Sequence, residues 1–224
     1  VGVDNTFALV KNLTQKDYFV QSNKECYKQI NDSIYYINID KITKQQFEEL
    51  IPILIEQKGI ILDFRGYPKM SSFDYIPYLI NKKEDVDQFI AIPVFLYPDR
   101  EKMICNYTGH ITFNPKGPHI KAKIVCLIDG AELSATETHL IYLKELDIAT
   151  IIGSPTSGAT GSISSIDLLG EKKITFTGMK AIFPDKSEFH RVGIKPDIYI
   201  QKTVSDISNN KDPLINCAIE YLIK

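Results

Sequence analysis

Apolar residues in this chain gather into short continuous runs. The run SIYYINI at residues 33–39 is β-branched and aromatic, and IILDF at 60–64 and IVCLI at 124–128 are almost entirely apolar. Runs of this length are typical of strands buried on both faces of a parallel sheet. We therefore predict three strands at these positions.

Helical spacing follows these runs. Thr43 and Gln46 form a T-x-x-Q capping box, and apolar residues then recur every three or four positions up to Ile55. Ser71 or Ser72 is placed to cap a second, short helix. Further helices are predicted at 134–146 and 212–223, the second capped by Asp212, and further strands at 91–96, 109–113, 148–152, 162–168, 173–177, 180–183 and 197–200. Alternating strands and helices predict an α/β fold built from right-handed crossover units.

Composition excludes several kinds of function. The chain is 44% hydrophobic with a net charge of −2, and its 26 basic and 28 acidic residues are spread along it, so we expect no nucleic-acid partner. No apolar run reaches the roughly 18 residues of a membrane helix, so no membrane span is expected. The four cysteines lack CxxC spacing and the four histidines are scattered, so we predict neither a metal site nor a cofactor.

A serine follows the third predicted strand, and it has two interpretations. Ser134 and Glu137 form S-x-x-E, which is typical of a structural capping box. Alternatively, Ser134 is a nucleophile, because a helix start supplies unpaired N–H groups, such as that of Ala135, to an oxyanion. A nucleophilic serine also needs a base within hydrogen-bond reach, and local spacing does not identify one.

Four segments, in one order, resemble the S41 serine peptidases, which include the tail-specific proteases and the tricorn core protease. They are SIYYINIDKITKQQFEEL, GIILDFRGYP, IVCLIDGAELSATETHLIYLKELDIATIIGSPTSGAT and GIKPDIYI. The resemblance implies a ClpP/crotonase-like ββα superhelix core with β-rich decoration. It places the catalytic core at residues 33–224. Because the chain begins at Val1, we expect residues 1–32 to be the remnant of, or link to, a missing upstream region.

The resemblance assigns the nucleophile to Ser134 and raises the question of its base. Tail-specific proteases carry a lysine where this chain has Ala159, and a methyl group cannot accept a proton. The loop is more similar to the tricorn-like branch, which uses a histidine and an assisting glutamate. We expect the histidine to come from outside this chain or to be His190, with Glu188 as the assisting acid.

The segment DFRGYPKMSS departs from the D-L-R-x-N-x-G-G pattern of the family. It keeps Asp63, Arg65 and Gly66 but has Pro-Lys-Met where the paired glycines stand. We therefore predict an oxyanion hole made from the amides of Gly66, Tyr67 and Ala135. Asp63 and Arg65 are predicted to form a buried ion pair at the strand end.

Other polar residues have structural interpretations. His139 lies five positions after Ser134 on the predicted helix and cannot fold back to it, so we expect a packed or surface histidine. Asp197, in P-D-I, is expected to bond local backbone at a turn.

The resemblance predicts a serine peptidase that hydrolyses peptide bonds through an acyl-enzyme on Ser134, with a peptide or unfolded protein as substrate. The alternative is a catalytically inactive module that binds a peptide, lipid or glycan in the former active-site cleft. A third possibility is a structural partner domain in a cell-envelope complex. Bacterial relatives often work outside the cytoplasm, so we expect an exported, periplasmic or cell-envelope protein.

Overall fold

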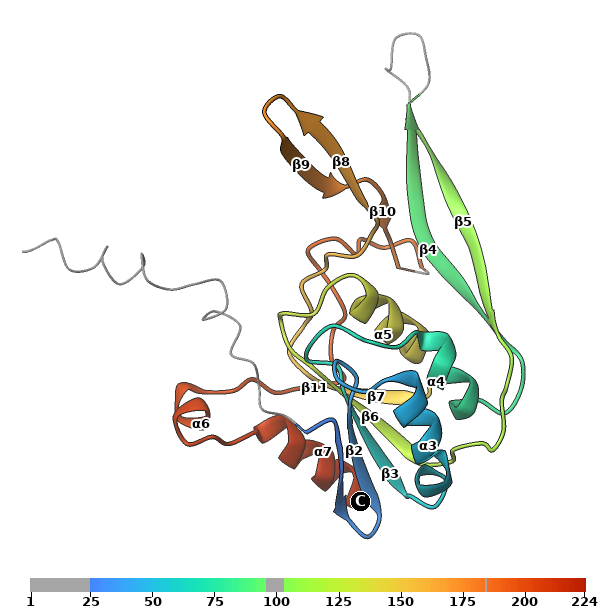
Figure 1. The fold of residues 1–224 in the computed structure, drawn as a ribbon, viewed down its shortest axis with the longest axis vertical. Helices are drawn as coiled ribbons and strands as arrows, with labels where there is room; N and C mark the ends of the chain where they lie inside the picture. Colours follow the sequence, from blue (N-terminus) through green and yellow to red (C-terminus); the bar gives the residue numbers. More distant parts are fainter. Residues whose placement is uncertain (1–24, 96–102, 184) are drawn as a thin grey trace, which may run out of the picture.

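The computed structural model describes residues 25–95, 103–183 and 185–224. Its centre is a six-stranded sheet in the order β1-β2-β3-β6-β7-β11 (Figure 1). The strands are β1 (Tyr27–Asn31), β2 (Ile34–Asn38), β3 (Gly59–Asp63), β6 (Lys123–Ile128), β7 (Ala149–Gly153) and β11 (Ile198–Tyr199). β1 pairs antiparallel with β2, and every later pair is parallel. The predicted α/β class is confirmed, and the carboxyl ends of β3, β6 and β7 share one edge.

Helices cover both faces of the sheet. Side chains alternate along each strand, so that Ile60 and Leu62 of β3 join one core cluster while Ile61 joins another. The first cluster includes residues of α3 (Lys44–Leu54), α4 (Ser72–Leu79) and α5 (Ala135–Glu145), and the second includes residues of α7 (Pro213–Ile223). Because both faces are buried, the strands read as continuous apolar runs.

The helix starts agree with the sequence in two cases and differ in a third. Thr43 and Gln46 form the predicted capping box of α3, and Ser71 caps α4 in the same way. Asp212 precedes Pro213 as predicted, but its side chain makes no cap hydrogen bond. Its carboxylate lies 2.9 Å from Arg65 instead. Asp212 is thus the N-cap residue of α7, as predicted, but an ion pair takes its carboxylate.

The predicted ion pair at the end of β3 is confirmed. Arg65 Nη2 lies 2.7 Å from Asp63 Oδ2, and the Tyr36 hydroxyl donates to the same oxygen at 2.7 Å. Arg65 Nη1 donates to Asp212 at 3.0 Å. Because Asp63 is fully buried, this network ties the end of β3 to the start of α7.

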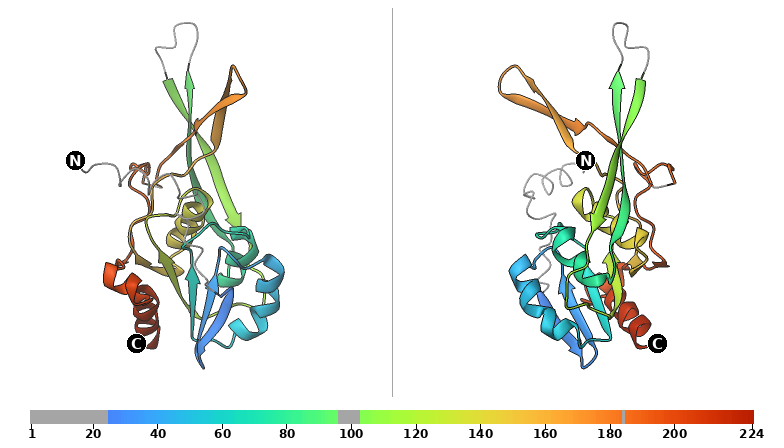
Figure 2. Two further views of the ribbon diagram at one scale, coloured as in Figure 1. Left: turned by 60° about the vertical axis from the view of Figure 1, so that its left-hand side comes forward. Right: turned by 90° about the vertical axis from the view of Figure 1, so that its right-hand side faces the viewer.

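Two hairpins project from the same end of the molecule (Figures 1 and 2). They are β4 (Glu84–Phe95) with β5 (Met103–Phe113), and β8 (Ile163–Leu168) with β9 (Lys172–Thr177). The short β10 (Lys180–Ala181) adds to the edge of β4. These elements are the β-rich decoration expected from the sequence, and the first hairpin is longer than the strands predicted at 91–96 and 109–113.

Two described elements were not predicted. β1 lies inside the segment 1–32, so the central sheet begins before residue 33; residues 1–24 of that segment lie outside the described residues. The helix α6 (Val204–Ser208) starts at a capping box formed by Thr203 and Asp206. Within the described ranges, none of the helices combines the length and hydropathy needed to cross a bilayer.

Candidate active site

Ser134 occupies a strained turn between β6 and α5. Its backbone has φ 53° and ψ −119°, a conformation that is costly for any residue with a Cβ. The side chain is half-buried and makes no cap hydrogen bond. The capping-box interpretation of Ser134 is therefore wrong. A sharp strand-to-helix turn of this kind is how hydrolases of another fold expose a nucleophilic serine.

The capping box fails because Glu137 binds elsewhere. Glu137 is fully buried, and its Oε1 accepts from Thr156 Oγ1 at 2.6 Å and from Gly158 N at 2.7 Å. Its Oε2 accepts from Ala159 N at 2.9 Å. Since all three groups donate, Glu137 acts as a carboxylate that fixes the loop after β7 against the first turn of α5.

Loops after β3 and β7 both hold the turn that carries Ser134. The N–H of Ser134 donates to Ala159 O at 3.0 Å, and Thr160 Oγ1 donates to Ser134 O at 2.8 Å. On the other side, Thr136 Oγ1 donates to Gly66 O at 2.9 Å. The loop after β7 thus bonds the main chain of Ser134 directly, and the loop after β3 bonds Thr136 in the first turn of α5, while the Ser134 hydroxyl makes no cap hydrogen bond.

The three predicted oxyanion donors are not equivalent. The Gly66 amide donates to Phe64 O at 2.7 Å, and the Tyr67 amide donates to Asp40 Oδ1 at 3.3 Å. The amide of Ala135, the first residue of α5, has no acceptor among the described residues. The Ala135 amide can therefore donate to an oxyanion without losing another bond, whereas the amides of Gly66 and Tyr67 already donate to other acceptors.

Among the residues whose side chains the structure describes, none contacts the hydroxyl of Ser134 as a base. Its Oγ forms no hydrogen bond with residues 25–87, 111–183 or 185–224. His190 Nε2 lies 3.0 Å from Thr160 O and 3.2 Å from Ala181 N, so it donates to the first when protonated and accepts from the second when not. His190 therefore lies beside Thr160, whose hydroxyl donates to Ser134 O.

The predicted assisting acid lies in a different environment. Glu188 is 53% exposed and forms an ion pair with Lys180 at 2.9 Å. The structure does not bring Glu188 into hydrogen-bond contact with His190 or Ser134 in this arrangement. The part of the chain that is described also contains no group of three or more His, Cys, Asp or Glu side chains placed to hold a metal ion.

His139 is a buried structural residue, which confirms the packed interpretation. Its Nε2 accepts from Ser72 N at 3.2 Å, and its Nδ1 lies 3.3 Å from the Tyr75 hydroxyl. Its ring also packs edge-on against Phe64. Burial lowers the pKa of His139 to about 4, so the ring is neutral at pH 7 and supports the far side of α5.

Asp197 also has a structural role, although not the local one expected. Its Oδ2 accepts from Ile151 N on the neighbouring strand β7 at 2.8 Å, and its own N–H donates to Ile151 O at 2.8 Å. Asp197 thus joins the start of β11 to β7.

Glu132, which the sequence did not single out, is buried in the turn between β6 and α5 that carries Ser134. Its Oε2 accepts from Asp129 N at 2.6 Å, and its Oε1 is buried without a partner in the described residues. Burial, and then the charge of Asp129, raise the pKa of Glu132 to about 9, so it is neutral at pH 7. Its main-chain O accepts from Ser157 N at 3.1 Å and from Ser157 Oγ at 2.6 Å.

Sequence comparison matches residues 74–200 to the profile of peptidase family S41. Among curated proteins, the chain is 24% identical over 207 residues to an uncharacterized protein of Chlamydia muridarum, covering 90% of this chain and 32% of that protein. A protein of Chlamydia trachomatis serovar D is 21% identical with the same coverage. The chain therefore spans about a third of the length of these curated relatives.

Solved structures with the same fold include a "putative peptidase" from Parabacteroides merdae, at 20% identity and a TM-score of 0.71, covering 94% of this chain and 69% of that one. Mature CPAF matches at 15% identity and a TM-score of 0.62, covering 85% and 50%. The tricorn protease matches at 22% identity and a TM-score of 0.57, covering 85% and 18%. At these identities the likeness shows the fold alone.

Proposed function

The chain belongs to peptidase family S41, and from that premise we propose that it hydrolyses peptide bonds through an acyl-enzyme on Ser134. The observation that carries the proposal is the backbone of Ser134, which is held at φ 53° by the loops after β3 and β7. Such strain persists where the surrounding structure enforces it, and it is common at catalytic positions. A serine needed only as a helix cap would have its side chain bonded to the helix.

In the proposed reaction, Ser134 Oγ attacks the carbonyl carbon of the scissile bond while its proton passes to a general base. The oxyanion that forms is stabilised by the amide of Ala135 and by the positive end of α5. Gly66 or Tyr67 adds a second donor by exchanging its present acceptor for the oxyanion. The C–N bond then breaks, the amine leaves with the proton, and water hydrolyses the ester on Ser134.

We infer that the base is tricorn-like rather than a lysine. Ala159 occupies the lysine position of the tail-specific proteases and cannot accept a proton. Within the described part of the chain, His190 is the candidate, since it contacts Thr160, whose hydroxyl donates to Ser134 O. The other candidate is a histidine outside this chain, and Glu188 would assist either base only after leaving Lys180.

Substrates of the proposed reaction are peptides or unfolded proteins. The chain spans about a third of the length of its curated relatives. The proposed peptidase activity and peptide substrates are therefore assigned to this chain, and for a longer protein that contains it they are likewise proposed. We further propose an exported, periplasmic or cell-envelope location, which rests on the resemblance to bacterial peptidases.

Hydrolysis of fluorescein-labelled, unfolded casein tests the proposal. Wild-type protein should release fluorescent peptides, and Ser134→Ala should release none above background. Ser208→Ala, which changes an exposed serine on α6, serves as the matched control and should retain activity. Equal rates for wild type and Ser134→Ala would refute the assignment, and binding of casein without hydrolysis by wild type would support the inactive-module alternative.

A further inference from the structure

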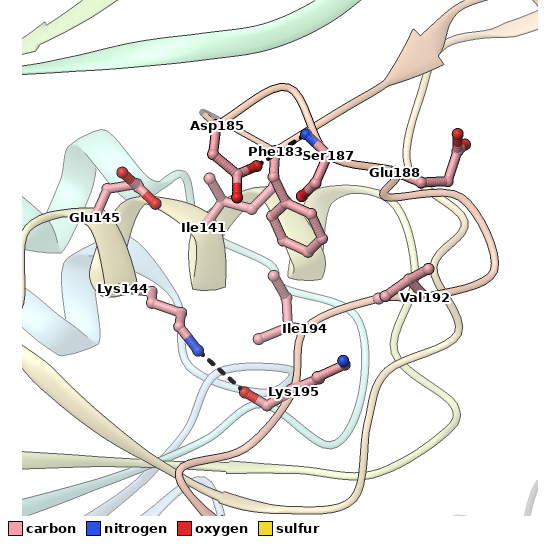
Figure 3. Close-up of a pocket in the computed structure, with 11 residues that line it drawn as sticks. Ile141, Lys144, Glu145, Phe183, Asp185, Ser187, Glu188, Val192, Ile194 and Lys195 are labelled. Atoms are coloured by element: carbon pink, nitrogen blue, oxygen red, sulfur yellow. Dashed lines mark hydrogen bonds between the residues drawn. The ribbon is translucent and has the colours of Figure 1, made fainter.

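A cavity of about 570 Å³ lies between the second half of α5 and a wall formed by Phe183 and by residues within 185–195 (Figure 3). Its apolar wall includes Ile141 and Phe183 as well as Ile194. Two carboxylates, those of Glu145 and Asp185, lie at one end of this wall in Figure 3. The cavity therefore combines an apolar surface with a concentration of negative charge.

The two carboxylates are not neutralised by the described part of the chain. Asp185 Oδ1 accepts from Ser187 N at 2.9 Å, and neither Asp185 nor Glu145 forms an ion pair with a described residue. Burial, followed by the charge of Asp185, raises the pKa of Glu145, whereas hydrogen bonds from Ser187 lower the pKa of Asp185 and favour its charged form. A positive group placed between them would relieve this repulsion.

Other charged residues of the lining are already engaged or face elsewhere. Lys144 Nζ donates to Lys195 O at 3.2 Å and lies 3.8 Å from Asp197. Glu188 pairs with Lys180 and points away from the wall, and the Lys195 ammonium lies at the opposite end from Glu145 in Figure 3. The unsatisfied charge at the carboxylate end is therefore negative.

We propose that this cavity binds an arginine or lysine side chain of a polypeptide. The aliphatic stem of that side chain would pack on Ile141, Phe183 and Ile194, and its cationic end would bond Glu145 and Asp185. Long basic side chains bury their methylene groups in this way while their charge meets carboxylates. The choice of a polypeptide as occupant rests on the proposed function.

The cavity is separate from the place where a scissile bond would lie. Glu145 is eleven residues after Ser134 on the same helix, which corresponds to about 16 Å along the helix axis. An extended peptide covers that distance with about five residues. The two places are connected, because Ile194 N donates to Thr156 Oγ1 at 2.8 Å and Thr156 is bound by Glu137. The cavity thus fits an exosite that selects a basic residue remote from the cleaved bond.

Peptide binding to the Ser134→Ala protein tests the exosite without requiring hydrolysis. The probes are fluorescein-labelled Gly-Ser decapeptides with a central Leu-Arg or a central Leu-citrulline, measured by fluorescence anisotropy. Citrulline keeps the shape of arginine and removes its charge. We expect the arginine peptide to bind about tenfold more tightly, the combined effect of two exposed charge pairs.

Matched variants locate the effect. The preference for arginine should disappear in Glu145→Gln/Asp185→Asn and persist in Glu188→Gln, a lining residue whose carboxylate is paired elsewhere. Equal binding of the two peptides, no binding of either, or a preference that survives in the double variant would each overturn the proposal. The protein in this binding test carries Ser134→Ala and is not assayed for hydrolysis. A negative binding result would therefore overturn the exosite without changing the outcome of the casein assay on the wild-type protein.

Discussion

Glu137 is the residue on which the geometry around Ser134 most depends. Its buried carboxylate accepts three hydrogen bonds of 2.6–2.9 Å from the loop after β7. Hydrogen bonds to a charged group contribute about 1.5–3 kcal/mol each. The sum of these three hydrogen-bond energies overstates the loss of stability, because the freed loop can form hydrogen bonds with water instead. We therefore expect Glu137→Ala to lower the free energy of unfolding by about 3–5 kcal/mol, the usual cost of breaking a buried charged network.

Urea unfolding followed by circular dichroism measures this change directly. Glu137→Gln should lose less stability than Glu137→Ala, since its amide oxygen keeps one acceptor. Its NH2 group, however, would face donors and cannot replace the second acceptor. Glu220→Gln, at an exposed position of α7, is the control and should change the free energy by less than about 0.5 kcal/mol. A loss below about 1 kcal/mol for Glu137→Ala would refute the role assigned to this carboxylate.

Three further predictions concern the same region. Ser134→Gly should raise the free energy of unfolding by about 1 kcal/mol in urea titration, because glycine relieves the positive φ; no gain over Ser134→Ala would show that the turn is not strained. Glu132 keeps its proton in the folded chain from near pH 4.5 to about pH 9, whereas the unfolded chain releases it, so stability should fall with rising pH across that window by up to about 1.4 kcal/mol per unit. Glu132→Gln should flatten this slope, and an unchanged slope would exclude Glu132 as its source. Arg65→Met should cost about 3–5 kcal/mol in thermal or urea unfolding because it leaves Asp63 buried without its partner, and a loss within about 0.5 kcal/mol would contradict that pairing.

The central strands could be predicted from sequence because burial on both faces leaves a direct signature. β3 and β6 have no polar face, so their residues form continuous apolar runs. β1 instead lies at an exposed edge of the sheet, and its sequence YKQIN contains no continuous apolar run. Asp212 shows a second limit of sequence-based prediction. The local pattern predicts correctly that Asp212 precedes the helix, but not that its carboxylate binds an arginine 147 positions away.

The sequence identified Ser134 as the candidate nucleophile, but it did not predict the contacts that hold the turn around it. The S-A-x-E segment located Ser134, but S-x-x-E spacing is the same whether Glu137 returns to its own helix or crosses to another loop. The loop residues that Glu137 binds lie 19 to 22 positions later in the chain. A contact over that separation leaves no pattern in the local sequence. Glu132 was missed because an acidic residue in a turn is usually solvated, and only the fold shows that this one is buried.

Covalent labelling by a fluorophosphonate probe tests the central claim, that Ser134 is a nucleophile in an open site. Tryptic digestion isolates residues 124–144, a peptide in which Ser134 is the single serine. Mass spectrometry should find the phosphonyl adduct on this peptide in wild-type protein and should find none after the Ser134→Ala change. Labelling that is absent from wild type, or that maps to another serine and persists in Ser134→Ala, would contradict the account.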